Sequence, residues 1–444
     1  MRGFRSTLLL VVVFLALLGL YFYERDLPDP SAPEDKPTAF VLEADDIEEL
    51  TVTAAGGDVS TLRKDEDGWH LVAPEAARAD ETELTSLTQS LASLEIQRVV
   101  DENASDLAQY GLEPPRIDVA FRAGDQADPT HLLLGDKTPT GTELYARTSD
   151  GDRVFLISSY LESTFNKTPF ALRDKAILKF ERNDVTSLEI TRAGETVSLV
   201  KEGADWNLSS PLRATGDYST VEGIIGQIHS ARMTSVAATS TDELGQYGLD
   251  RPTLRAVVVA GGARQTLEVG GPAPQAGVYA RDSSRPLVFT IPQVIATELD
   301  KPAADYRRKD LFDFRSFNAT AVELTRDNVT AVFEKVEGSD EDASDAWRQV
   351  APTAQDVDSA AFESAIAQLS GLRIQSFTDT GTATGLDSPV AEVLVKFDAG
   401  GREERVTFGR SGSNVYAARA DEPGAARIDA SIFDSAMGAL DDFR

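Results

Sequence analysis

Three tryptophans, the only ones among the 444 residues, divide the chain into similar stretches. Each is followed five positions later by a proline, which pairs Trp69 with Pro74, Trp206 with Pro211 and Trp347 with Pro352. A second anchor is a glycine before a leucine, at Gly111, Gly248 and Gly385, so that both intervals are 137 residues. Anchors that recur in one order at this long period indicate three tandem domains, because the repeats of a solenoid are only about 20–50 residues long.

Within the first repeat, the hydrophobic pattern predicts strands on both sides of one helix. Residues 50–54 alternate in polarity, residues 60–64 can pair back to them across a Gly-Gly turn, and the Trp69 strand follows. Asp80 can cap a helix whose leucines share one face, with equivalent helices expected at 220–230 and 358–370. Further strands are expected at 117–122, 131–134, 144–147 and 154–157, and a short helix at 159–166. This pattern predicts the α+β class, with an antiparallel sheet and a helix in each repeat.

The N-terminal residues have the pattern of a membrane anchor. Residues 6–23 carry no charge, and as a helix they would span about 27 Å, close to the thickness of a bilayer core. Arg2 and Arg5 precede this segment and acidic residues follow it, which predicts a cytoplasmic N-terminus. A cleaved signal peptide is the alternative, but the segment ends in bulky aromatic residues, which favour an uncleaved anchor.

These observations divide the chain into segments. We expect a cytoplasmic stub at 1–5, a single transmembrane helix at 6–23 and a Pro-rich acidic linker at 24–37. The repeats are expected at 38–182, 183–316 and 317–444. A basic pair recurs only at the two junctions between repeats, as Arg173 with Lys175 and Arg307 with Lys309. Their restriction to the junctions indicates an inter-unit clamp. For Arg173 and Lys175 the helix dipole favours capping of the preceding short helix, and a binding role is a further alternative.

The same motifs carry a resemblance to a known family. An N-terminal anchor, Gly-Trp-x-x-x-x-Pro units, a Tyr-Gly-Leu-x-x-Pro turn and a Leu-Arg-Asp-Lys junction resemble the bacterial family catalogued as domain of unknown function 4340. The resemblance covers nearly the whole chain from about residue 40 on. Members are often encoded beside ABC-2-type permeases and gliding-motility-like components, which implies a place in a transporter-associated envelope complex. The family brings no catalytic residues that could be transferred to this chain.

Composition argues against several classes of function. The chain has 73 acidic and 43 basic residues, a net charge of −30, which disfavours nucleic acid as a partner. It contains no cysteine, which excludes disulfides, cysteine zinc ligands and a thiol nucleophile. We therefore expect no catalytic residues, no cofactor and no metal site.

Three weaker candidates have two interpretations each. The histidines, His70, His131 and His229, are far apart in the sequence and match no metal-binding or catalytic pattern. The acidic run from Asp340 to Asp345 could bind Ca²⁺, but its spacing misses the calcium-loop pattern and favours a solvated hairpin tip. The tryptophans could be exposed recognition rings, but the strand pattern favours core residues that cover the long helix.

The sequence thus predicts a bacterial inner-membrane protein whose bulk is periplasmic or extracytoplasmic. The expected function is a non-enzymatic scaffold or accessory subunit of an envelope complex, associated with an ABC-type transporter through protein partners. One alternative is a module that binds a polysaccharide or peptide in a cleft between repeats. A periplasmic hydrolase is the third interpretation, and it would need two carboxylates that converge in space.

Overall fold

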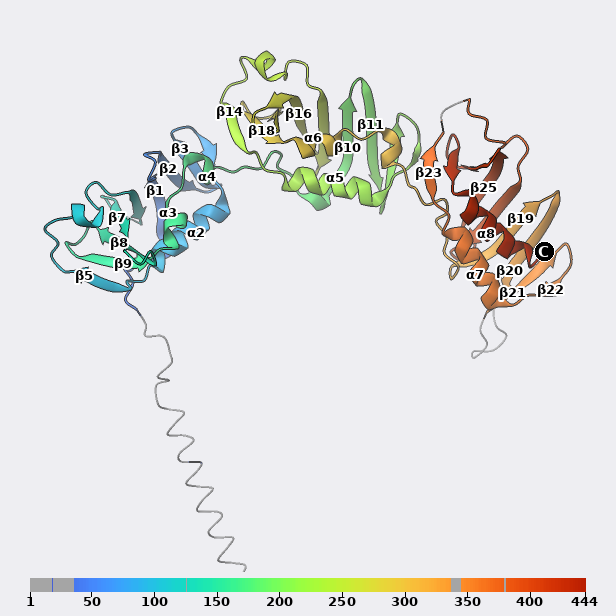
Figure 1. Cartoon of the computed structure of the whole chain (residues 1–444), viewed down its shortest axis with the longest axis horizontal. Helices are drawn as coiled ribbons and strands as arrows, with labels where there is room; N and C mark the ends of the chain where they lie inside the picture. Colours follow the sequence, from blue (N-terminus) through green and yellow to red (C-terminus); the bar gives the residue numbers. More distant parts are fainter. Residues whose placement is uncertain (1–17, 19–35, 125, 337–344, 379–380) are drawn as a thin grey trace, which may run out of the picture. The chain divides into compact units, whose positions relative to one another are not determined.

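The computed structural model describes residues 18, 36–124, 126–336, 345–378 and 381–444. The chain forms two compact units, Met1–Asp174 and Lys175–Arg444. The first unit contains one nine-stranded antiparallel sheet and the second contains two (Figure 1). We call these three modules the first, second and third repeats.

All three sheets have the same strand order, β4-β3-β2-β1-β6-β7-β8-β9-β5 in the first repeat and its equivalents in the others. The first sheet consists of β1 Ile47–Thr53, β2 Val59–Asp65, β3 Gly68–Ala73, β4 Ala77–Arg78, β5 Arg98–Asp101, β6 Ile117–Ala123, β7 Thr130–Lys137, β8 Glu143–Thr148 and β9 Val154–Ser158. The second consists of β10 Val185–Arg192, β11 Glu195–Glu202, β12 Asp205–Ser210, β13 Ala214–Thr215, β14 Ser235–Ala238, β15 Leu254–Ala260, β16 Ala263–Ala273, β17 Gly277–Asp282 and β18 Val288–Pro292. The third consists of β19 Ala319–Arg326, β20 Val329–Val336, β21 Ala346–Ala351, β22 Gln355–Asp356, β23 Ile374–Phe377, β24 Ala391–Phe397, β25 Arg402–Ser411, β26 Asn414–Arg419 and β27 Ala426–Ile428.

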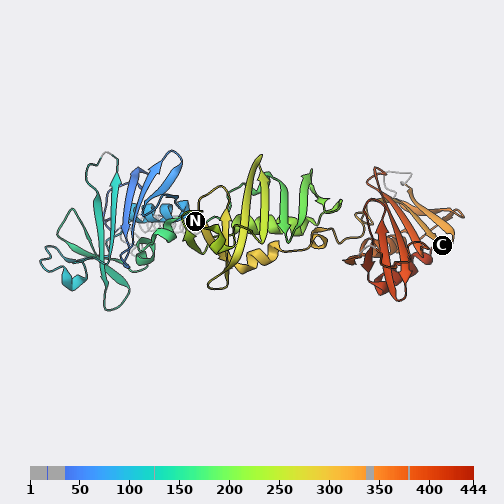
Figure 2. The same cartoon turned by 90° about the horizontal axis from the view of Figure 1, so that it is seen from above.

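The helices of each repeat lie on one face of its sheet (Figures 1 and 2). The α-helices are α2 Glu81–Ala92, α3 Leu161–Phe165, α4 Pro169–Leu172, α5 Tyr218–Ser230, α6 Gln293–Leu299, α7 Ser359–Ser370 and α8 Ala430–Asp441. The short 3-10 helices are η1 Ala44–Asp46, η2 Ala108–Tyr110, η3 Arg182–Asp184, η4 Leu244–Tyr247 and η5 Ala303–Tyr306.

The expected fold class is wrong. Each repeat is dominated by one nine-stranded antiparallel sheet, so the described part of the chain is a sheet-dominated fold and not the expected α+β class. Within the described ranges, no helix is both long enough and apolar enough to cross a membrane. The expected anchor at 6–23 lies outside the described residues except for Leu18, and so does most of the expected linker. The sequence pattern missed β4 and β5, because strands of two and four residues are too short to show alternation, and these strands complete the sheet at both edges.

One apolar layer between sheet and helices forms the core of each repeat. In the first repeat, Leu50 and Val52 of β1 point inward while Thr51 and Thr53 do not, which is the alternation expected of a sheet with one buried face. The helix side comes from the leucines of α2, whose 3–4 spacing forms a single apolar stripe. The third repeat differs because the twelve-residue α8 takes the place of shorter helices and joins the core through Phe433, Met437 and Leu440.

Local signals explain where the long helices begin. The Asp80 carboxylate accepts from the backbone N–H groups of Thr82 and Glu83, which confirms the expected N-cap of α2. Asp217 and Asp358 cap α5 and α7 in the same way. The N-cap aspartate is therefore a feature of the repeat, and it places each long helix against the strand that carries the tryptophan.

Candidate functional site

The three tryptophans occupy one position in the three sheets. Trp69 on β3, Trp206 on β12 and Trp347 on β21 are exposed by 5%, 1% and 1%. The Trp206 indole N–H donates to Glu222 Oε1 on α5 at 3.0 Å, and the Trp347 indole donates to Glu363 Oε1 on α7 at 3.3 Å. A buried ring cannot stack on a sugar or a partner, so these contacts favour the core interpretation.

The other repeat anchors lie in turns. The prolines follow the tryptophan strands and are exposed: Pro74, Pro211 and Pro352. The glycines have positive φ angles of 66°, 67° and 72°: Gly111, Gly248 and Gly385. A Cβ at Gly248 would also come within 2.9 Å of the Gly271 backbone nitrogen, so both conformation and space require glycine at this turn.

The second junction, residues 306–311, is hydrogen-bonded through its main chain to both the second and the third repeat. Two bonds join it to the end of β13 and the start of α5, and two join it to the segment between α7 and β23. The bonds are Asp217 N–H to Tyr306 O at 2.7 Å, Arg308 N–H to Thr215 O at 2.9 Å, Leu311 N–H to Leu372 O at 3.0 Å and Ile374 N–H to Lys309 O at 2.7 Å. The junction therefore behaves as a short strand shared by two repeats.

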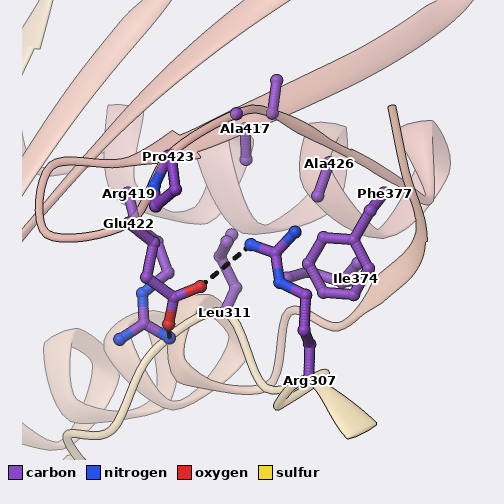
Figure 3. Close-up of a pocket in the computed structure, with 11 residues that line it drawn as sticks. Arg307, Leu311, Ile374, Phe377, Ala417, Arg419, Glu422, Pro423 and Ala426 are labelled. Carbon is purple, nitrogen blue, oxygen red and sulfur yellow. Dashed lines mark hydrogen bonds and ion pairs between the residues drawn. The ribbon is translucent and has the colours of Figure 1, made fainter. Parts of the chain in front are cut away.

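Arg307 is the buried centre of this junction (Figure 3). Its guanidinium lies 3.6 Å from the centre of the Phe377 ring and donates to Glu422 Oε2 at 3.0 Å. Glu422 belongs to the loop between β26 and β27, and its other oxygen accepts from the Thr215 N–H at 3.0 Å. Arg419 approaches the same carboxylate at 3.7 Å. One carboxylate of the third repeat thus contacts the junction and the edge of the second sheet.

A second charged cluster continues from Arg308 into the third repeat. Arg308 pairs with Asp313, which also accepts from Arg402 at 2.7 Å. Glu404 accepts from the Asp313 N–H at 2.8 Å and lies 3.9 Å from both Arg308 and Arg419. Burial raises the pKa of Glu404, and the Asp313 N–H offsets only part of this effect. Burial would also raise the pKa of Asp313, but Arg308 and Arg402 outweigh it, so that pKa is lowered.

The first junction uses its arginine differently. Arg173 is 4% exposed and pairs with Glu75, which follows Pro74 in the same repeat. Lys175 accepts a main-chain bond from the Met233 N–H at 2.8 Å. Lys309 is only loosely paired, 3.8 Å from Asp305. Both arginines of the expected clamp are thus buried and ion-paired, Arg173 with the half-buried Glu75 and Arg307 with the buried Glu422. The backbone carbonyl of each lysine accepts a main-chain bond, that of Lys175 from Met233 and that of Lys309 from Ile374.

Sequence reasoning missed the partners that receive the junctions. Glu422 lies 115 residues after Arg307, too far for any local pattern to indicate. The repeat interval was the available signal, because Arg285 lies 137 residues before Glu422. Arg285 also contacts a junction, donating to Ala176 O at 2.9 Å and Ile177 O at 2.7 Å. The loop after β17 in the second repeat and the loop after β26 in the third repeat therefore each contact the junction that precedes that repeat.

The remaining candidates are not brought together. The histidine contacts are His70 with Asp65 at 3.3 Å, His131 with Asp118 at 2.9 Å and His229 with Phe180 O at 3.1 Å. Over the ranges that the structure covers, no three His, Asp or Glu side chains are placed to hold a metal ion. Most of the acidic run at 340–345 lies outside the described residues.

Comparison with known proteins decides the family. The family model described as Domain of unknown function (DUF4340) matches residues 69–214 and 206–389, more than half of the chain. The chain belongs to this family. Each match begins at a tryptophan strand and runs into the following repeat, so it includes the junction.

Two further comparisons add nothing to this assignment. A search of curated proteins found no match. A solved DNA polymerase sliding clamp from Pseudomonas aeruginosa aligns at 9% identity over 87% of this chain and 92% of that chain, with a TM-score of 0.15. This score is too low to carry an argument about fold or function.

Proposed function

We propose that this DUF4340 protein is a non-enzymatic scaffold or accessory subunit of a bacterial envelope complex that contains an ABC-type transporter. The observation that supports it is the second junction, where main-chain bonds and the buried Arg307–Glu422 pair tie one segment to two sheets. Joining repeated modules through buried contacts keeps their surfaces in a defined relation, and this property suits a protein that positions partners. We also infer that the chain carries three copies of the family's unit, because the three sheets have one strand order.

We propose a location at the bacterial inner membrane, with the repeats on its extracytoplasmic side and the N-terminus in the cytoplasm. The support comes from sequence alone: residues 6–23 are uncharged, Arg2 and Arg5 precede them, and acidic residues follow. A reporter that is active only in the cytoplasm, fused after Arg444, should be silent. Strong activity of that fusion would contradict this location.

Cross-linking in native membranes followed by affinity purification tests the scaffold proposal. The wild-type chain should recover envelope proteins, including transporter subunits, in constant proportion. Arg307→Ala should reduce their recovery because it removes the buried pair, whereas Ala at the exposed Arg213 should not. Recovery of no envelope protein above the background of an untagged strain would refute the proposal.

A ligand-binding module is the second candidate, favoured by one observation. A polar hollow of about 910 Å³, partly open to solvent, lies between β11–β13 of the second repeat and the Asp421–Glu422 loop of the third. Arg213, Asn207 and Ser209 line it beside these acids. If a peptide binds there, Arg213→Ala should weaken its binding, so this variant separates the two proposals.

A further inference from the structure

A second hollow, in the first repeat, is not explained by the scaffold proposal. It lies where α2 ends and α3 begins, has a volume of about 660 Å³ and is partly open to solvent. Its walls carry hydroxyl, carboxylate and amide groups from Ser90, Ser158, Glu95 and Gln97. We propose that this hollow binds a neutral carbohydrate, whose ring stacks on the exposed side chain of Tyr160.

Tyr160 is an exposed aromatic ring on a fixed backbone. It is 70% exposed, whereas the next residue, Leu161, is 6% exposed and belongs to the core. The Tyr160 carbonyl accepts from the Ser163 N–H at 3.2 Å and from its hydroxyl at 2.9 Å, and the Ser159 N–H donates to Thr142 O at 3.0 Å. An aromatic side chain has few rotatable bonds, so a ring held in this way offers a large apolar surface at low entropic cost.

The groups around the ring suit a ligand with many hydroxyls. Leu94 and Leu161 are buried apolar residues of the lining, and the other lining side chains apart from Tyr160 are polar. The Gln97 amide donates weakly to Glu95 at 3.5 Å and accepts from Lys36, an arrangement that leaves Glu95 able to accept stronger bonds. A sugar hydroxyl can donate to this carboxylate and accept from a serine hydroxyl, while the C–H face of the sugar covers the tyrosine ring.

Charge selects among sugars. Glu95 lines the hollow, and the net charge of the chain is −30, so the overall field disfavours a phosphorylated or carboxylated sugar even with the Lys36 ammonium beside Gln97. Among the described residues, one aromatic ring lines the hollow, whereas recognition of a quaternary ammonium group needs a cage of several rings. A neutral pyranose meets both conditions.

The other repeats show that the fold does not require these residues. Glu95, Arg232 and Arg373 make the equivalent bridge in the three repeats, so an arginine replaces the acid twice. The Arg232 guanidinium donates to carbonyls at the end of α5, including Ser230 O at 2.9 Å. Val294 lies 134 residues after Tyr160, the interval that also separates Tyr145 from Tyr279, and it is 60% exposed. The tyrosine and the acid are therefore particular to the first repeat, as expected of a binding site and not of a packing requirement.

Saturation-transfer NMR on the full-length protein, in a detergent without a sugar headgroup, tests this inference. The probes are maltopentaose, cellopentaose and chitopentaose at millimolar concentration. At least one should receive saturation at its ring C–H protons. Tyr160→Ala should weaken that binding at least about tenfold, and Tyr160→Phe should retain it within about threefold, because stacking needs the ring and not the hydroxyl.

The equivalent position of the second repeat supplies the matched control. Val294→Ala removes an exposed apolar side chain of the same helix start and should leave sugar binding unchanged. The proposal is overturned if none of the three oligosaccharides responds, or if Tyr160→Ala binds as tightly as the wild type. Envelope proteins should still be recovered with Tyr160→Ala, so failure here and failure of the scaffold proposal give different results.

Discussion

Replacing Glu422 with alanine should uncouple the third repeat from the second. The carboxylate is bonded to Arg307 and to the Thr215 N–H, and its side chain is only 7% exposed. Removing it leaves Arg307 and Arg419 buried without this acid, and breaking a buried pair from one side costs about 3–5 kcal/mol. Arg307 keeps its stacking on Phe377, which lessens the loss, so we expect about 3 kcal/mol.

The tryptophans provide the assay, because each repeat has one. In chains that keep a single tryptophan and carry phenylalanine at the other two positions, urea unfolding reports on one repeat at a time. Glu422→Ala should shift the transitions reported by Trp206 and Trp347 to lower urea, and leave the Trp69 transition in place. Asp421→Ala is the matched control, because the Asp421 side chain is next to Glu422 in the sequence but 65% exposed, so its removal should change stability little.

Two results would refute this reasoning. One is a free energy of unfolding for Glu422→Ala within about 0.5 kcal/mol of the wild type, the range of an ordinary surface substitution. The other is an equal shift of the Trp69 transition, which would show a general loss of stability. A double-mutant cycle with Arg307→Ala should give a coupling energy of at least about 1 kcal/mol between the two residues.

Three further predictions concern the repeats themselves. Trp206→Ala should lower the free energy of unfolding by about 3–5 kcal/mol, measured by calorimetry, because it empties a large buried site; retention of wild-type stability would contradict the core position. Glu404 has a raised pKa in the folded chain, so its ionisation lowers stability progressively as pH rises above the ordinary glutamate pKa of 4.5. Glu404→Gln imitates Gln265 of the second repeat and should remove this loss of stability in urea titrations from about pH 4 to pH 8. An unchanged pH slope would contradict it. Gly248→Ala should cost about 1–3 kcal/mol because of its φ of 67°, whereas Gly223→Ala on the open face of α5 should be neutral or stabilising by up to about 1 kcal/mol; equal effects would show that the turn tolerates a side chain.

Much of each repeat could be predicted from local pattern. Residues 50–53 of the first predicted strand lie within β1, residues 154–157 lie within β9, and Asp80 caps α2 as expected. Alternation and N-cap chemistry could be predicted because they depend on a few neighbouring residues. The short edge strands could not be predicted in this way, and without them the sheet content was underestimated. This omission led to the wrong fold class.

The candidate site was only half predictable. A basic pair at each junction was visible from its repeat, but what each arginine binds depends on contacts far apart in sequence. Arg307 pairs with Glu422, 115 residues later in the sequence, whereas Arg173 pairs with Glu75 of its own repeat. The local sequence around the two arginines is similar, so it could not distinguish a contact within a repeat from a contact between repeats.

The difference between these arginines agrees with the division of the chain after Asp174. Arg173 is neutralised inside the first compact unit, whereas Arg307 is neutralised by the next repeat, and the second and third repeats form one compact unit. The position of Glu75 corresponds to Leu212 in the second repeat, one residue after Pro211, so Arg307 has no acid there. The residue after the proline, Glu75 or Leu212, thus determines whether the junction arginine has an acidic partner in its own repeat or depends on one in the next repeat.

Transplanting that acid tests the argument. In the Glu422→Ala background, Leu212→Glu should give Arg307 a local partner and restore about 1.5–3 kcal/mol to the transition reported by Trp206, the worth of a charged hydrogen bond. The Trp347 transition should stay at lower urea, because the new carboxylate cannot reach the third repeat in the way that Glu422 does. Leu212→Gln is the control, as it has the same length and no charge. If the two transitions recover together, the acid at position 422 stabilises the chain by some route other than joining the repeats, and the distinction between the two junctions fails.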